Sequence, residues 1–267
     1  AFDQAIELTP NHTERDSFTW EVPDGWQQGR GSWGGLPVGA MLAAVSHSEP
    51  DPRRTVRSIS AQLIGPAVVG AHQVKATAVR TGKAMTTWAV EIRGGDGATI
   101  ALATVLTGAP RGTVSKDVAS TWCAMECPAA PSSRDVPIAP TPPPFPTFTK
   151  HCEYRVISGT PMQGGRAETL GWIGYREPTA WTAASLIALV DAWYTVTMVG
   201  LQEMIPVATI NFSANLLINP AELPAGEPLL HHAVVSGVRD GYASEHRRLW
   251  TADGRLAVDN LQSVAVG

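Results

Sequence analysis

The sequence contains an internal repeat, and this repeat limits the possible folds more than any other feature. Residues 79–82 are Val-Arg-Thr-Gly, residues 238–241 are Val-Arg-Asp-Gly, and each segment precedes a strand-like run. In both copies an Asp-Gly pair, at 96–97 or 253–254, then turns the chain into another such run. The matching glycines are 159 positions apart at the first turn and 157 at the second. The chain therefore predicts two related units of similar length.

Each copy begins with an apolar stretch that favours helix and continues with a segment that alternates polar and apolar residues. In the first copy the helical stretch is 39–45 and the alternating segment is 58–63. In the second copy the corresponding segments are 183–190 and 209–216, with Ile210 on the apolar face. Both copies are typical of one buried helix followed by four or more antiparallel strands joined by glycine turns.

A helix that is apolar nearly all round must be enclosed, and a long, curved antiparallel sheet could wrap around it. This arrangement is the hotdog fold, and two copies in one chain make a double hotdog of the α+β class. Other α+β packings of a helix and a meander fit the same pattern. A proline-rich segment separates the copies. We therefore expect an N-terminal hotdog unit at 1–109, a Pro-rich linker at 110–147 and a C-terminal hotdog unit at 148–267.

The composition argues against several classes of protein. With 20 Lys and Arg against 24 Asp and Glu, the chain has no basic patch to bind nucleic acid. The longest apolar stretch, 180–201, carries Asp191 at its centre, so we expect no membrane span. The first residues lack the features of a secretory signal. Cys123, Cys127 and Cys152 are an odd number without zinc spacing, so we expect a cytoplasmic protein with no metal or other cofactor.

Polar residues interrupt two apolar segments of the second copy. Asp191 lies in the helical stretch, where a carboxylate must be hydrogen-bonded, paired or protonated. Gln262 lies in the otherwise apolar closing segment, and its counterpart in the first copy is Val105. Structural interpretations stay open: neighbouring backbone amides can satisfy a helix-terminal Asp, and a strand residue such as Thr209 is common for its shape alone.

These features resemble the acyl-CoA thioesterase II family, the TesB-like double-hotdog thioesterases. Residues 34–42 are similar to the Gly-Gly-x-x-x-Gly-x-x-Leu motif that opens that family's first central helix. Asp191, Thr209 and Gln262 match its catalytic trio in order, in the second helix region, the following strand and the last strand. The resemblance covers most of the chain from about residue 29 onward, apart from the linker.

The resemblance implies that the protein hydrolyses an acyl-CoA thioester to a free acid and CoA, in fatty acid metabolism. Asp191 would act as the general base on a water molecule held by Thr209 and Gln262. The backbone amides of Gly34 and Gly35 would stabilise the oxyanion that forms on the thioester carbonyl.

Trp193, Tyr194 and Met198 are then expected to line an apolar slot for the acyl chain. Because Val105 replaces the glutamine and no carboxylate occurs at 34–45, we expect one working site, in the second copy. Exposed edges of hotdog sheets commonly pair, so we expect a homodimer or a higher homo-oligomer.

Two other functions fit parts of the sequence. A hotdog hydratase or dehydratase is suggested by Asp191, because polyketide double hotdogs also carry an Asp in the second helix. Such an enzyme would need a His-x-x-x-Gly-x-x-x-x-Pro or an Asp-x-Asn-x-x-His pattern, and neither occurs. A non-catalytic acyl-CoA or acyl-thioester binding protein is suggested by two departures from the family. Its members often carry Gln after the Gly-Gly pair and Asp-His after Thr-Ile, where this chain has Leu36 and Asn211-Phe212.

Overall fold

One antiparallel sheet of twelve strands runs through both copies of the repeat. The computed structural model describes residues 1–112, 114, 122, 125–177 and 180–267; part of the predicted linker lies outside these ranges. The first copy contributes β1 (Leu8–Pro10), β2 (Ser17–Val22), β5 (Thr55–Leu63), β6 (Gly70–Thr81), β7 (Met85–Arg93) and β8 (Thr99–Gly108). The second copy contributes β9 (Cys152–Ser158), β10 (Glu168–Tyr175), β11 (Val207–Leu216), β12 (Leu229–Arg239), β13 (Tyr242–Trp250) and β14 (Leu256–Val266). A separate two-stranded ribbon is formed by β3 (Gln27–Gln28) and β4 (Gly31–Ser32).

The strand order shows how the copies are related. The sheet runs β1-β2-β6-β7-β8-β5-β11-β14-β13-β12-β10-β9, so the two copies meet where β5 pairs with β11. Outward from this pair, the order of the next strands is the same on both sides. At the predicted Asp-Gly turns, Gly97 and Gly254 have φ values of 81° and 83°, a backbone conformation that glycine adopts readily. The repeat therefore generates one continuous sheet with an approximate twofold relation.

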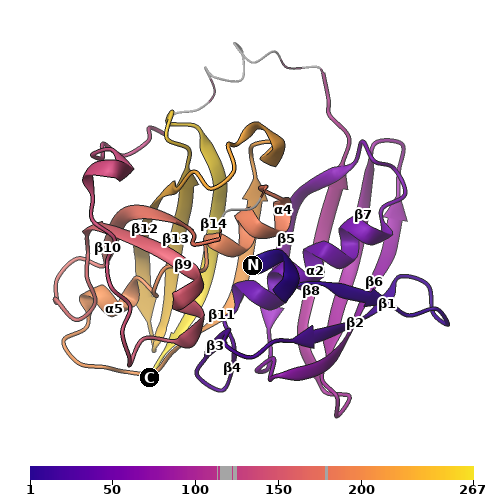
Figure 1. Cartoon of the computed structure of the whole chain (residues 1–267), viewed down its shortest axis with the longest axis horizontal. Helices are drawn as coiled ribbons and strands as arrows, with labels where there is room; N and C mark the ends of the chain where they lie inside the picture. The colour runs from indigo at the N-terminus through magenta and orange to yellow at the C-terminus, as the bar shows by residue number, and fades with distance from the viewer. Residues whose placement is uncertain (113, 115–121, 123–124, 178–179) are drawn as a thin grey trace.

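Two central helices lie within the curve of the sheet. They are α2 (Gly35–Ser48) and α4 (Ala183–Leu189), which contact each other, and Figure 1 shows them between the indigo-to-magenta and orange-to-yellow halves. The shorter helices are α1 (Phe2–Ala5) and α5 (Thr197–Gly200), with 3-10 turns at Ser133–Asp135, Thr147–His151 and Pro220–Glu222. The predicted α+β double hotdog is confirmed. Within the described residues, no helix combines the length and apolar character needed to cross a membrane.

One predicted alternation is wrong at the start of β11. The side chain of Ile210 is 36% exposed instead of facing the core, while Phe212 is fully buried. The cause is a β-bulge, because the pairing with β14 shifts by one residue between Thr209 and Asn211. Thr209 pairs with Val264 on the inner face, so the bulge turns the Thr209 side chain toward the interior.

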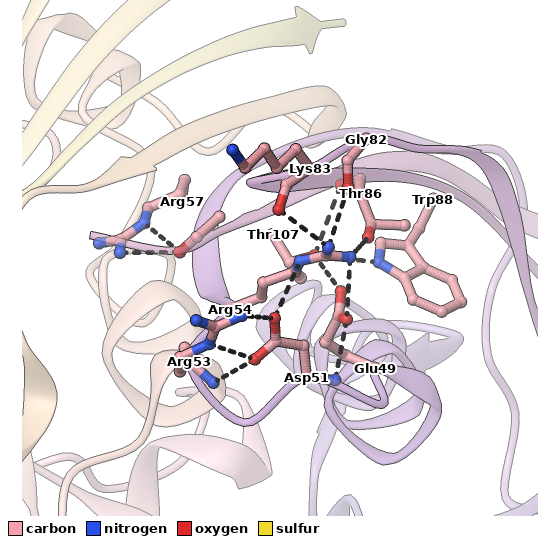
Figure 2. Close-up of polar contacts among 11 residues, drawn as sticks. Glu49, Asp51, Arg53, Arg54, Arg57, Gly82, Lys83, Thr86, Trp88 and Thr107 are labelled. Atoms are coloured by element: carbon pink, nitrogen blue, oxygen red, sulfur yellow. Dashed lines mark hydrogen bonds and ion pairs between the residues drawn. The ribbon is translucent and has the colours of Figure 1, made fainter. Parts of the chain in front are cut away.

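A buried polar cluster ties the C-terminal end of α2 to the sheet (Figure 2). Glu49, which follows the helix, accepts a hydrogen bond of 2.5 Å from the Thr107 hydroxyl. That hydroxyl in turn accepts a hydrogen bond from the Trp88 indole. Arg54 lies 3.6 Å from Glu49 and donates to the Thr86 hydroxyl at 2.8 Å. These contacts fix the position of α2, which carries part of the candidate site at its other end.

The substitution Glu49→Ala should lower the free energy of unfolding by about 2–4 kcal/mol, because it removes a buried carboxylate that partners Arg54 and Thr107. Urea denaturation would measure this loss. Arg53→Ala is the matched control, since Arg53 pairs with Asp51 on the surface and should leave stability nearly unchanged. Equal losses in the two variants would contradict a structural role for the buried cluster.

Candidate active site

A cavity of about 450 Å³ lies where the helix of the first copy begins and the helix of the second copy ends. Its wall includes Gly34, Asp191, Trp193, Thr209 and Arg247. Much of the remaining wall comes from the β3–β4 hairpin and from the ends of β5 and β8. Both copies are therefore needed to form this cavity.

Asp191 lies just after the last turn of α4, with its side chain directed at the first turn of α2. A Cβ atom placed on Gly34 would lie only 2.9 Å from Oδ2 of Asp191, so the absence of a side chain at Gly34 leaves room for the carboxylate. The backbone amide of Gly35 is close enough to lower the pKa of this carboxyl group. The Trp33 indole donates to the main-chain carbonyl of Asp191 at 3.0 Å. The positive end of the α2 dipole thus faces a negative side chain, which is favourable.

The structure brings together the three residues predicted to form the catalytic trio. The Thr209 hydroxyl donates to Oε1 of Gln262 at 2.9 Å, and Nε2 of Gln262 donates to Oδ1 of Asp191 at 2.9 Å. Nε2 also donates to Oδ1 of Asn260 at 3.0 Å. Both amide hydrogens of Gln262 are therefore used, and its orientation is fixed. Gln262 therefore contacts Asp191 directly.

The environment of Asp191 suits a group that exchanges protons near neutral pH. Burial raises the pKa of its carboxyl from 3.8 to about 6. The charge of Arg247, the hydrogen bond from Gln262 and the amide of Gly35 oppose this rise in pKa, whereas the negative charge of Glu245 adds to it. A carboxyl group with a pKa in this range, at the wall of a cavity, can act as a general base.

Three polar residues of the site, Glu245, Arg247 and Asn260, were not predicted. Glu245 and Arg247 lie on β13 and are almost wholly buried. The alternation of side chains along β13 could have revealed them. Apolar Ala243 and Leu249 lie on the inner face of this strand, so every second residue between them must face inward too. Asn260 lies two residues before Gln262, on the same face of β14.

The residues predicted to contact the acyl chain lie in different places. Trp193 lines the cavity, and its ring stacks on that of His231 with centroids 4.9 Å apart. Tyr194 instead directs its hydroxyl to the carbonyl of Gly159, where β9 has ended. Met198 lies in α5, away from the cavity wall as the described residues define it.

The two glycines predicted to stabilise the oxyanion lie in different surroundings, and the residues that depart from the family pattern lie away from the cavity. Gly34 lines the cavity, whereas Gly35 packs under the indole of Trp33, whose ring lies 2.2 Å from where a Cβ would be. Leu36 and Phe212 are fully buried and belong to the hydrophobic core. The polar groups near Thr209 are therefore supplied by β13 and β14.

Strand register shows which residues of the first copy occupy the equivalent positions. Two cross-strand pairs face inward in each copy. They join β13 to β14 in the second copy and the equivalent strands, β7 and β8, in the first copy. In the second copy these residues are Glu245 with Gln262 and Arg247 with Asn260; in the first copy they are Trp88 with Val105 and Val90 with Ala103. All four first-copy residues are apolar and buried. The polar array is thus a property of the second copy.

The described residues contain no cluster of three or more His, Cys, Asp or Glu side chains that could hold a metal ion. Cys127 and Cys152 are free thiols. Cys123, which also entered the prediction of no metal site, lies outside the described residues.

Comparison with protein families identifies this chain. A model of the acyl-CoA thioesterase C-terminal domain matches residues 124–266, and a model of the acyl-CoA thioesterase N-terminal domain matches residues 22–108. The chain belongs to the acyl-CoA thioesterase family. The predicted family resemblance is therefore confirmed. A search of curated proteins found no match.

Solved structures of similar fold cover the whole of this acyl-CoA thioesterase family member. A conserved protein of unknown function with a hot dog fold from Alicyclobacillus acidocaldarius is 25% identical with a TM-score of 0.89, covering 100% of this chain and 97% of its own. The acyl-CoA thioesterase II TesB2 of Mycobacterium marinum is 16% identical with a TM-score of 0.78, covering 100% and 98%. The tesB protein of Mycobacterium avium subs paratuberculosis is 14% identical with a TM-score of 0.77, also covering 100% and 98%. The two mycobacterial structures show a shared fold.

The raised pKa of Asp191 makes a prediction about stability. Because the folded chain binds this proton more tightly than the unfolded chain, the stabilising contribution is fully present below about pH 3.8 and is lost as the pH rises through about 6. The variant Asp191→Asn has no carboxyl group at this position, so its stability does not fall in this way as the pH rises. Its free energy of unfolding, relative to wild type, should therefore rise by about 3 kcal/mol between about pH 3.5 and pH 7.5, measured by urea denaturation.

Asp253→Asn provides a control of opposite sign. The hydroxyl of Thr251 donates to this exposed carboxylate and holds its pKa below 3.8. Its removal should therefore cost stability at neutral pH and not at acid pH. If wild type and Asp191→Asn instead kept a constant difference over this range, Asp191 would not titrate near pH 6.

Proposed function

We propose that this protein hydrolyses acyl-CoA thioesters to a free acid and CoA, with water activated by Asp191. Membership of the acyl-CoA thioesterase family supports thioester hydrolysis in general. The observation that carries the specific proposal is the continuous hydrogen-bonded row from Thr209 through Gln262 to Asp191 at the wall of the cavity.

The proposed chemistry begins with a proton transfer. Oδ1 of Asp191 is held by Gln262, which leaves Oδ2, beside Gly34, to take a proton from water. The water oxygen forms a bond to the thioester carbonyl carbon, and the carbonyl oxygen becomes an oxyanion. Collapse of this intermediate breaks the carbon–sulfur bond. The departing CoA thiolate takes the proton from Asp191, because a carboxyl group with a pKa of about 6 is more acidic than a thiol.

The hydrogen bonds divide the roles of the trio. Thr209 gives its hydroxyl hydrogen to Gln262, so its oxygen can accept a hydrogen bond from the attacking water. Gln262 has both amide hydrogens engaged, so it orients Asp191 and Thr209 instead of holding the water itself. The amide of Gly35 is directed at Asp191, which leaves the amide of Gly34 for the oxyanion in this proposal.

The wider setting is part of the proposal. The acyl group would lie against Trp193 and the apolar ends of β5 and β8. Strands β1 and β9 form the two edges of the sheet, where antiparallel sheets commonly pair, in keeping with a homodimer or higher homo-oligomer. A cytoplasmic location and a role in fatty acid metabolism complete this view.

Asp191→Asn should lower kcat for CoA release by about 10²–10⁴-fold, the range for loss of a general base. Thr209→Val should also slow the reaction, because valine cannot hold the water, whereas Thr209→Ser should keep most of the rate. Wild-type kcat/KM should fall as the pH drops below about 6, where Asp191 becomes protonated. A thiol-release assay with acyl-CoAs of graded chain length measures all three effects.

Asp253→Asn, at an exposed turn, is the control and should leave the rate unchanged. Unchanged turnover in Asp191→Asn would exclude Asp191 as the base. Tight acyl-CoA binding without thiol release over hours would favour a binding protein. Reversible addition of water to an enoyl thioester would favour a hydratase.

A further inference from the structure

A buried guanidinium group lies beside the proposed base. The side chain of Arg247 is only 1% exposed, yet it reaches the cavity wall, and its Nη1 atom is 3.8 Å from Oδ1 of Asp191. The same nitrogen donates to the carbonyl of Trp193 at 3.2 Å. Burial of an arginine costs several kcal/mol unless its charge is paired and its hydrogens are bonded. The surroundings of Arg247 should therefore show what holds it there.

Glu245 holds the guanidinium from the side opposite Asp191. Its Oε2 atom accepts hydrogen bonds from Nε and Nη2 of Arg247, at 3.0 and 2.6 Å. Its other oxygen accepts from the backbone amide of Thr197 at 2.9 Å and from the hydroxyl of the same residue. A row of contacts thus runs from the start of α5 through Glu245 and Arg247 to Asp191, and each member is almost wholly buried.

The charges around Asp191 can be listed by the element that supplies them. Strand β13 contributes Arg247 and Glu245, and β12 contributes His231, whose pKa is held below its usual range by burial and by the charge of Arg247. Strand β14 contributes neutral amides, and α2 contributes a backbone amide. Among these described groups, Arg247 is therefore the one cation, and it lies between the buried carboxylates of Asp191 and Glu245.

We infer that Arg247 is a positioning residue of the proposed hydrolysis, which keeps the Asp191 carboxylate charged and oriented at the cavity wall, while Glu245 and Thr197 hold its guanidinium in place. This inference rests on the proposed function. Fold stability alone does not account for the pair, because an apolar pair of similar volume is often equally or more stable. The first copy shows this replacement, with Trp88 and Val90 at the equivalent positions of the same fold.

Three single variants test the inference. Arg247→Gln should move the acid limb of the kcat/KM profile upward by about one pH unit or more, since removal of an opposite charge at this distance raises the pKa of a carboxyl group. For a shift of one unit, activity should then be about fivefold lower at pH 6 and about tenfold lower at pH 5, and it should recover at higher pH. Glu245→Gln should move the limb in the opposite direction, because it removes a like charge. Arg248→Gln is the matched control: it changes the next residue of the same strand, which pairs with Asp259, and should move nothing.

The titration of Asp191 itself provides a readout that needs no turnover. Carboxyl ¹³C NMR, with the Asp191 signal assigned by its loss in Asp191→Asn, should show the same upward and downward shifts. If wild type releases no CoA while these shifts occur, the proposed function fails and the electrostatic pairing of Arg247 with Asp191 stands. An unchanged Asp191 titration, with activity lowered equally at every pH, would overturn the inference.

The test survives poor folding of one variant. Arg247→Gln leaves Glu245 without its cation and is the variant most prone to unfold. The double variant Arg247→Gln/Glu245→Gln leaves no unpaired charge in the pair, and its Asp191 pKa should lie between those of the two single variants. If Glu245→Gln raised the pKa of Asp191, or left it unchanged, the inference would be wrong.

Discussion

Burial of one carboxylate governs the arrangement of the candidate site. Asp191 is 8% exposed, and a charged group at this depth costs several kcal/mol unless other groups compensate. The compensating groups come from distant parts of the chain: the Gly35 amide at the start of α2, the Gln262 amide near the end of the last strand, and the Arg247 guanidinium. The site therefore depends on the packing of one copy against the other, as well as on the residues of the second copy.

The two copies use the same backbone plan with different inner side chains. The first copy fills the positions beneath its sheet with Trp88, Val90, Ala103 and Val105, which pack as an ordinary core. One buried polar cluster of the first copy lies instead around Glu49, at the far end of α2, where it anchors the helix. In the second copy the polar groups lie beside the cavity. The first copy thus supplies the helix start, and the second supplies the titratable groups.

Much of this could be predicted from the sequence, because local patterns determine it. The repeated turns and apolar helices gave the fold, and Asp191 and Gln262 stood out as polar residues in apolar runs. The bulge at Ile210 could not be predicted, since a single inserted residue leaves no periodic signal. Glu245 and Arg247 were missed because a strand rich in charged residues looks solvent-exposed until its phase is considered. Nearness to Asp191 in sequence misplaced Tyr194, because the chain turns away after α4.

The pairing of β5 with β11 within one chain has a consequence for how such a site can change. In a symmetric dimer of identical chains, every substitution occurs twice, at both symmetry-related positions. A change that favours chemistry on one side must then be tolerated by packing on the other. In a covalently joined pair, position 105 and position 262 vary independently. One copy can therefore specialise in supporting the fold while the other accumulates the buried, charged groups that a reaction centre requires.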